Sequence, residues 1–302
     1  MKKFIVKVAI FFCIIVLADF ILGNVFSYML SHAKGGETYR INYICDSTNQ
    51  DILILGSSRA QRHYNPAIIK DSLGLSCYNC GQSGQGIISN YAMLKIIKKR
   101  YSPQYIIYEV FPLYDFLKDD NHKYLGILKP YYDREGIPDI FNSVDGLEKY
   151  KMTSALYKYN TRFLHILQGY LSSSKGYNPD GYWPIRSGSF DSLRIMKPKM
   201  QDEYEFDSLK LHYFEEMIKE SGDSQIIFAV SPTWYGMDEG RLKPIYEICK
   251  RHNLPLIDYS NHPKYIHHSD FFRDGSHLNY QIGADEYTRD VIVELKKLNI
   301  LK

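Results

Sequence analysis

The sequence predicts an α/β fold built on a parallel sheet, because short apolar stretches alternate with helical patterns along most of the chain. Strands are expected at residues 52–55, 76–80, 105–111, 225–230 and 256–259, and each is almost continuously apolar. Strands of this kind are buried on both faces, which is typical of a parallel sheet covered by helices through right-handed crossovers. In such sheets, ligands bind beyond the carboxyl ends of the strands.

The predicted helices carry their own start and stop signals. Asn65 and Pro66 begin a helix over residues 65–73, which Gly74 ends. A glycine-rich turn at 81–86 leads into a second helix with apolar residues at helical spacing. Further helices are expected near residue 204, at 238–251 and at the C-terminus, where one apolar face is formed by Ala284, Tyr287, Val291 and Leu295. Strands therefore alternate with helices, as a parallel sheet requires.

Length, composition and charge limit the possible classes of protein. A chain of 302 residues with 45% apolar content can bury one substantial core, or one core plus an insertion. The net charge of +3 is small for this length, and no segment concentrates lysine and arginine. A nucleic-acid partner is therefore not expected.

The N-terminal 33 residues are predicted to be a signal anchor and linker, followed by one domain over residues 34–302. Lys2 and Lys3 precede an apolar stretch at 4–22, which only Lys7 and Asp19 interrupt. Positive residues before the stretch place the rest of the chain outside the cytoplasm. A removed signal peptide is the less favoured alternative, since residues 31–33 form a poor and late cleavage site. A buried helix is disfavoured by the glycines and polar residues that follow.

Residues 113–204 form an insertion that the alternation of strands and helices does not explain. It holds eleven of the 27 tyrosines, together with an aromatic run at 175–184. One interpretation is a mainly helical cap with a small core of its own. The other is a set of aromatic loops over an active site, where tyrosine and tryptophan rings stack on sugars.

The five cysteines do not indicate a metal or redox site. Cys13 lies in the apolar N-terminal stretch, and Cys77 and Cys80 form a single CxxC without a second pair. The predicted strand at 76–80 also argues against a redox motif, which would open a helix. The cysteines outside the anchor, including Cys45 and Cys249, are expected to be buried thiols or to form one disulfide whose pairing the sequence does not determine.

Two polar segments indicate nucleophilic chemistry. In DILILGSSRA, Ser57 and Ser58 follow a buried strand and precede a helix, whose N-terminal N–H groups favour negative charge. In FFRDGSHLN, Asp274 and His277 lie three residues apart before the last helix. A serine, a histidine and a carboxylate are the minimum set for acyl transfer. The competing interpretation is that the serines only cap the helix.

A histidine cluster elsewhere is a weaker candidate. His262, His267, His268 and Asp270 lie close in sequence and suggest metal ligation, but they lack helical spacing. We therefore expect a solvated loop there and no metal. Among the ten histidines, only His277 has a carboxylate partner at the position that the chemistry requires.

The motifs GSSRA, YNCGQSG and DGSHLN resemble the first, second and fifth blocks of the SGNH/GDSL hydrolase superfamily. The chain is most similar to its membrane-anchored bacterial branch, which is linked to the modification of cell-surface polymers. The resemblance covers roughly residues 50–112 and 205–300. It implies a flavodoxin-like three-layer α/β/α sheet and ester or acyl-transfer chemistry without a cofactor or metal. It also implies Ser58 as nucleophile, Asp274 and His277 as its partners, and the backbone N–H groups of Ser58 and Gly84 as oxyanion donors.

The chain departs from the family pattern at two positions. Ser57 replaces the family's aspartate, and no asparagine follows the third strand, where the family has an oxyanion donor. Losing one such donor costs about two to three orders of magnitude in rate. Arg59, next to the nucleophile, is interpreted either as a source of positive charge or as one partner of a structural salt bridge.

The sequence therefore predicts a serine esterase or O-acyltransferase that acts on an acylated or acyl-accepting cell-envelope glycan. The missing asparagine favours an alternative, in which a catalytically weak or inactive member of the same fold binds glycan or serves as a scaffold for a membrane acyltransferase.

Overall fold

The computed structural model describes residues 1–172, 180–185, 190 and 203–298. It contains a five-stranded sheet of order β2-β1-β3-β4-β5, in which every pair of neighbouring strands is parallel. The strands are β1 (Ile52–Gly56), β2 (Cys77–Asn79), β3 (Tyr105–Glu109), β4 (Gln225–Val230) and β5 (Leu256–Asp258). The predicted α/β class and the parallel sheet are confirmed.

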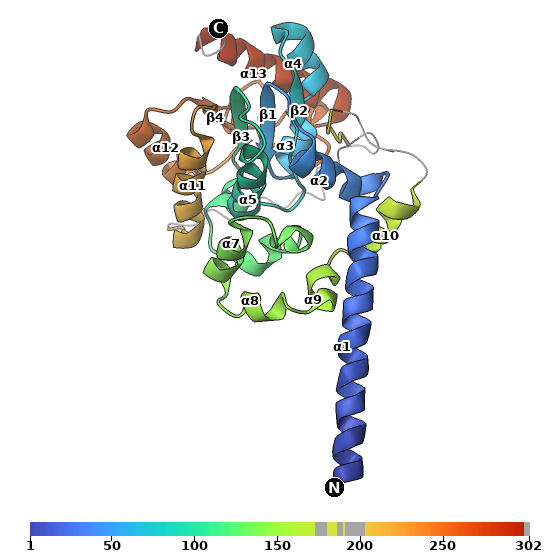
Figure 1. The fold of residues 1–302 in the computed structure, drawn as a ribbon. Helices are drawn as coiled ribbons and strands as arrows, with labels where there is room; N and C mark the ends of the chain where they lie inside the picture. Colours follow the sequence, from blue (N-terminus) through green and yellow to red (C-terminus); the bar gives the residue numbers. More distant parts are fainter. Residues whose placement is uncertain (173–179, 186–189, 191–202, 299–302) are drawn as a thin grey trace. The chain divides into compact units, whose positions relative to one another are not determined.

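Helices cover both faces of this sheet (Figure 1). They are α3 (Ser58–His63), α4 (Pro66–Leu73), α5 (Ile87–Lys98), α11 (Ser208–Ser221), α12 (Glu239–His252) and α13 (Asp285–Lys297). Short elements follow β3 and precede α13, namely α6 (Pro112–Asp115), η4 (Ser269–Phe271) and η5 (Tyr280–Ala284). The arrangement is consistent with three layers.

Side chains alternate between the two faces of each strand, as strand geometry requires. On one face, Ile54 and Ile227 belong to a buried core that includes Tyr287 and Val291 of α13. On the other face, the rings of Tyr108 and Phe228 pack against Phe214 of α11. Both faces are therefore apolar and buried, which explains the nearly continuous apolar strands.

The predicted caps of α4 are present. The Asn65 side chain accepts a hydrogen bond of 3.1 Å from the Ala67 N–H at the start of the helix. Gly74 ends the helix with a left-handed φ of 71°. Local capping chemistry therefore determined both ends of this element.

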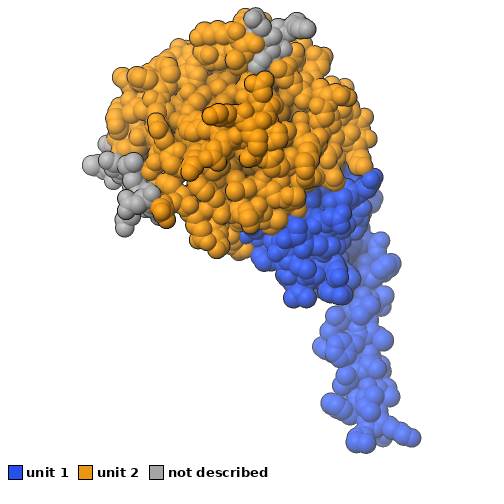
Figure 2. Space-filling view, turned by 90° about the vertical axis from the view of Figure 1, so that its left-hand side faces the viewer, with its two compact units in different colours: residues 1–45, 121–176 blue, residues 46–120, 177–302 orange. Residues whose placement is uncertain are grey.

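The chain forms two compact units (Figure 2). The first, unit 1, combines Met1–Cys45 with Asn121–Gly176, and the second, unit 2, combines Asp46–Asp120 with Tyr177–Lys302. The sheet and its helices belong to unit 2. The helices of unit 1 are α1 (Lys2–Ser31), α2 (Gly36–Asp46), η1 (Asn121–Tyr124), η2 (Lys129–Tyr131), α7 (Ile137–Val144), α8 (Glu148–Lys151), α9 (Ala155–Tyr159) and α10 (Phe163–Leu171).

Helix α1 is long and apolar enough to cross a membrane, and none of its residues is buried. Unit 1 joins this helix to the helical part of the expected insertion, which has buried apolar residues such as Leu128, Ile137 and Phe141. Of the aromatic run at 175–184, residues 175–179 lie outside the described residues.

The cysteines are all free thiols. Cys13 is exposed on α1, and Cys45, Cys77, Cys80 and Cys249 are buried. Of the two interpretations considered for them, the structure contains the buried thiols.

Candidate active site

The turn after β1 places two serines at the carboxyl edge of the sheet. Gly56 ends the strand with a φ of 135°, and a Cβ atom at this position would lie 2.6 Å from the carbonyl oxygen of Glu109. Only glycine fits there. Ser57 is the N-cap of α3, because its Oγ accepts a 3.3 Å hydrogen bond from the Arg59 N–H. The capping role considered for the two serines therefore belongs to Ser57, and the Ser58 hydroxyl is not used for it.

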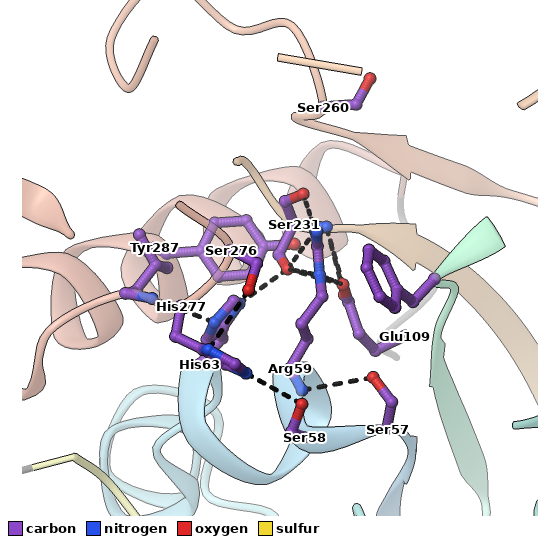
Figure 3. A network of polar contacts seen from close by, with 12 residues as sticks. Ser57, Ser58, Arg59, His63, Glu109, Ser231, Ser260, Ser276, His277 and Tyr287 are labelled. Atoms are coloured by element: carbon purple, nitrogen blue, oxygen red, sulfur yellow. Dashed lines mark hydrogen bonds and ion pairs between the residues drawn. The ribbon is translucent and has the colours of Figure 1, made fainter. Parts of the chain in front are cut away.

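Two segments that are distant in sequence form one chain of hydrogen bonds, and Figure 3 shows its link between Ser58 and His277. The Ser58 Oγ lies 2.9 Å from His277 Nε2. The other ring nitrogen, His277 Nδ1, lies 2.9 Å from Asp274 Oδ2. Both distances are within the range that proton transfer requires. The structure therefore brings together Ser58, His277 and Asp274, as the sequence motifs predicted; their catalytic roles stay a prediction.

The environment of Asp274 keeps this side chain ionised. Burial raises the pKa of the carboxyl group, but hydrogen bonds and the charge of His277 outweigh that effect and hold the pKa well below its usual range. Two of the hydrogen bonds come from the backbone N–H groups of Ser276 and His277, each at 2.9 Å. A carboxylate beside Nδ1 favours the proton on that nitrogen, so Nε2 is left to accept from Ser58.

Replacing Asp274 by asparagine is expected to lower turnover of an activated acetyl ester. The loss should be about ten- to a hundredfold smaller than the loss caused by Ser58→Ala. The amide disturbs the imidazole tautomer but leaves the attacking group in place. Steady-state kinetics of the three proteins provides the measurement. A variant as active as the wild type would show that Asp274 does not orient His277.

A second histidine, His63 on α3, lies beside this chain of hydrogen bonds. Its ring is fully buried, and its Nε2 accepts a 3.1 Å hydrogen bond from the N–H of Leu278, the residue after His277. Its Nδ1 therefore carries the proton and donates to Ser231 Oγ at 2.7 Å. Burial, followed by the nearby charge of Arg59, lowers the pKa of His63 well below its usual value. A neutral imidazole thus holds the backbone next to His277.

Arg59 and Glu109 form an ion pair that water does not reach. The exposed fractions of their side chains are 1% and 0%, and Arg59 Nε lies 3.1 Å from Glu109 Oε1. Glu109 also accepts hydrogen bonds from the Ser231 N–H at 3.0 Å, from Ser231 Oγ at 2.6 Å and from the Tyr64 hydroxyl. The guanidinium group lies over the ring of Phe111. Of the two roles considered for Arg59, the structure places it in the salt bridge.

The second glycine-rich turn is attached to the segment that carries Ser58. Gln82 donates its backbone N–H to the Gly56 carbonyl at 2.9 Å, and Ser83 donates its hydroxyl to Gln61 Oε1 at 2.6 Å. Gly84 lies in this turn with a left-handed φ of 71°. The turn is therefore bonded to residues on both sides of Ser58, and the role of Gly84 as an oxyanion donor stays a prediction.

Gln82 has an unusual environment in the part of the chain that the structure describes. Its side chain is only 1% exposed, yet neither atom of its amide group has a hydrogen-bond partner there. A buried amide without partners costs free energy, about 1–3 kcal/mol, and such groups are often explained by function. Sequence reasoning missed this residue because glutamine in a turn is unremarkable.

No asparagine directly follows β3 in this chain, and the segment at that position has a structural role. The buried Asp115 accepts hydrogen bonds from the Phe111 N–H at 2.7 Å and from the Tyr108 hydroxyl at 2.8 Å. Burial raises the pKa of Asp115 to about 7, against the effect of these hydrogen bonds. This carboxyl group closes the turn.

Part of the aromatic run lies next to α3. The backbone N–H of Trp183 donates to the carbonyl of Gln61 at 3.1 Å, and its side chain is 43% exposed. The neighbouring Tyr182 is buried in the core of unit 2. One exposed aromatic side chain of this run is thus on a segment bonded to α3.

Two groups of polar residues contain possible metal ligands. The histidines at 262, 267 and 268 lie in loops beside η4, where His262 stacks on Tyr259.

In unit 1, possible metal ligands of His122, Asp145 and Glu148 lie within 4.8 Å of one another. The Lys151 ammonium already binds Asp145 at 2.6 Å and Glu148 at 2.9 Å. A cation of the chain itself therefore already pairs with both carboxylates.

Comparison with known proteins adds little to this geometry. The chain matches neither a family model nor a curated protein. One solved crystal structure is similar over 83% of this chain and 97% of its own, with 11% sequence identity and a TM-score of 0.40. A TM-score this low does not establish a shared fold, so neither fold nor function is inferred from this likeness.

Proposed function

We propose that the protein is a serine esterase or O-acyltransferase of the SGNH/GDSL type. The observation that carries this proposal is the hydrogen-bonded chain from Ser58 through His277 to Asp274. The strand order β2-β1-β3-β4-β5 supports a flavodoxin-like fold, in which ligands bind at the carboxyl edge of the sheet. The serine turn lies at that edge, directly after β1.

The reaction proceeds in two halves. In the first, Ser58 Oγ attacks the acyl carbonyl while its proton moves to His277 Nε2, and the resulting imidazolium is stabilised by Asp274. The tetrahedral intermediate collapses, and His277 gives the proton to the departing alcohol oxygen. In the second half, His277 takes a proton from water or from a sugar hydroxyl, whose oxygen attacks the acyl group on Ser58. Release of the acid or new ester returns the proton to Ser58.

The negative oxygen of each intermediate needs hydrogen-bond donors. The backbone N–H groups of Ser58 and Gly84 serve this purpose in the proposal. The amide of Gln82 is the candidate for the third donor, because it is buried, has no partner among the described residues and belongs to the turn bonded to Gly56. A preorganised donor of this kind contributes about 3–4 kcal/mol to transition-state stabilisation.

The proposed substrate is an acylated or acyl-accepting glycan of the cell envelope, and no cofactor or metal takes part. The proposed placement supports this class, since Lys2 and Lys3 before the apolar part of α1 favour an orientation with the remaining chain outside the cytoplasm. The exposed indole of Trp183 beside α3 offers a surface on which a sugar ring can stack.

The alternative function is a glycan-binding or scaffold partner of a membrane acyltransferase. The absence of the third-block asparagine favours it, as does Ser57 in place of the family's aspartate. The alternative predicts a folded protein that binds envelope glycans without forming an acyl-enzyme.

A fluorophosphonate probe distinguishes the two functions. We expect the full-length protein in detergent to be labelled covalently on Ser58, because only an activated serine displaces the fluoride. Mass spectrometry of the labelled peptide identifies the residue, and Ser57→Ala is the matched control that should still react. An unlabelled wild-type protein that retains glycan binding would support the scaffold and overturn the esterase.

A further inference from the structure

With the proposed insertion of α1 in a membrane, the length of this helix places a further part of unit 1 at the depth of the bilayer. The helix has 30 residues and is therefore about 45 Å long, whereas the hydrocarbon core of a bilayer is about 30 Å thick. A core that begins at Phe4 spans about 20 residues and ends near Gly23. Asp19 lies within this span, where an unpaired carboxylate would be costly.

Asp19 is fully paired by the start of another helix. Its carboxylate accepts hydrogen bonds from the backbone N–H groups of Ala155 at 2.8 Å and Leu156 at 2.7 Å, and from the Ser154 hydroxyl at 2.8 Å. These donors are at the N-terminus of α9. Figure 1 shows α9 beside the middle of α1, with the N-terminal half of α1 extending beyond it. The bonds to Asp19 thus hold α9 at the level of the bilayer.

Several apolar side chains on the helices α8, α9 and α10 have a high exposed fraction. Leu156 on α9 is 45% exposed, and Leu164 on α10 is 63% exposed. Further exposed apolar residues are Leu147 in the loop before α8, Tyr150 on α8, and Phe163, Leu167 and Leu171 on α10. A water-facing surface of short helices would carry polar residues at these positions. We call this set the α8–α10 apolar surface, and two of its helices, α9 and α10, contact α1.

The opposite side of α10 is already occupied within unit 1. Ile166 is buried, and the carbonyl of Gly169 accepts hydrogen bonds from the N–H groups of Lys34 at 2.8 Å and Gly35 at 3.3 Å. A Cβ atom at Gly169 would lie 3.0 Å from the Gly35 oxygen, so the backbones pack closely. The exposed leucines of α10 therefore do not belong to the core of unit 1.

Charged and aromatic residues at the edge of the α8–α10 apolar surface match a membrane interface. Lys149 lies over the ring of Tyr150, which is 64% exposed, at 4.9 Å from the ring centroid. Tyrosine is enriched at the headgroup level, and lysine next to it is attracted by anionic lipids.

We propose that the α8–α10 apolar surface is immersed in the interface of the bilayer that α1 spans. Its occupant is lipid at the boundary between headgroups and acyl chains, and the bonds from Asp19 to α9 set the depth. Unit 1 is thereby attached to the membrane at two places, by a spanning helix and by a surface contact. This inference rests on the proposed membrane insertion of α1.

The experiment uses the full-length protein in vesicles of phosphatidylcholine and phosphatidylglycerol. Single cysteines at Leu156 and Leu164, in a Cys13→Ala background, carry an environment-sensitive fluorophore; the remaining cysteines are buried. We expect blue-shifted emission that lipids with a nitroxide near the headgroup quench and that aqueous iodide does not. Asp139→Cys, at an exposed acidic position on α7, is the matched control and should be quenched by iodide.

The wild-type protein labelled at Cys13 reports separately whether α1 is in lipid. If Cys13 is quenched by lipid nitroxides while Leu156→Cys and Leu164→Cys are quenched by iodide, the surface contact is overturned and the anchor stands. Protection of both positions from both quenchers would show that protein covers the surface, and would also overturn the proposal. If Cys13 itself is quenched by iodide, the membrane anchor fails, and the lipid contact fails with it.

Discussion

Replacing Ser58 by alanine is expected to lower acyl-ester turnover by about 10⁴- to 10⁶-fold, because the chemistry loses its nucleophile. His277→Ala should have an effect of similar size, since the Ser58 hydroxyl then has no base within 2.9 Å. Hydrolysis of an activated acetyl ester by purified full-length protein measures both.

The double variant provides the sharper test. Residues that act as a unit are not additive, so Ser58→Ala with His277→Ala should be hardly slower than either single variant. Ser57→Ala is the matched control, because it removes a hydroxyl from the neighbouring residue and costs about 1 kcal/mol of helix capping without touching the reaction. A strong loss at Ser57 with little effect at Ser58 would move the nucleophile by one residue.

Replacing Glu109 by alanine is expected to lower the free energy of unfolding of unit 2 by about 3–5 kcal/mol. The substitution leaves Arg59 buried without its counter-charge and removes the acceptor for Ser231 and Tyr64. Urea unfolding followed by tryptophan fluorescence reports this unit, since both tryptophans belong to it.

Two further variants test this explanation. Glu205→Ala breaks an exposed ion pair with Lys118, in which the side chains are 71% and 61% exposed, and should change stability by about 0–1 kcal/mol. Combining Arg59→Met with Glu109→Gln removes both charges and should cost less than Glu109→Ala alone. A double variant less stable than Glu109→Ala would show that unpaired charge is not the cause.

Strands and helix ends could be predicted from the sequence because their causes are local. Continuous apolar runs define strands that are buried on both faces, and Asn65 and Gly74 act on their own helix. The meeting of Ser58 with His277 was also predictable, since one motif follows a central strand and the other precedes the last helix. Both motifs are short enough to be recognised in the sequence.

The buried network around Glu109 and His63 could not be predicted in this way. Glu109 was part of an apolar strand and His63 was one of ten histidines, and nothing local distinguishes them. The charge of Glu109 near the end of a buried strand was the one signal in the sequence that pointed to this network. Their shared partner, Ser231, lies 168 residues from His63 and 122 residues from Glu109 along the chain, and only the packed sheet brings the three together.

The sequence by itself determined the parallel α/β sheet, the apolar N-terminal helix and the serine and histidine motifs, because each depends on residues that are neighbours along the chain. Only the tertiary structure decided which of two serines caps α3, that Arg59 is neutralised by Glu109, and that Asp19 is paired by α9. A polar group that leaves water needs a partner, and that partner is selected by proximity in space.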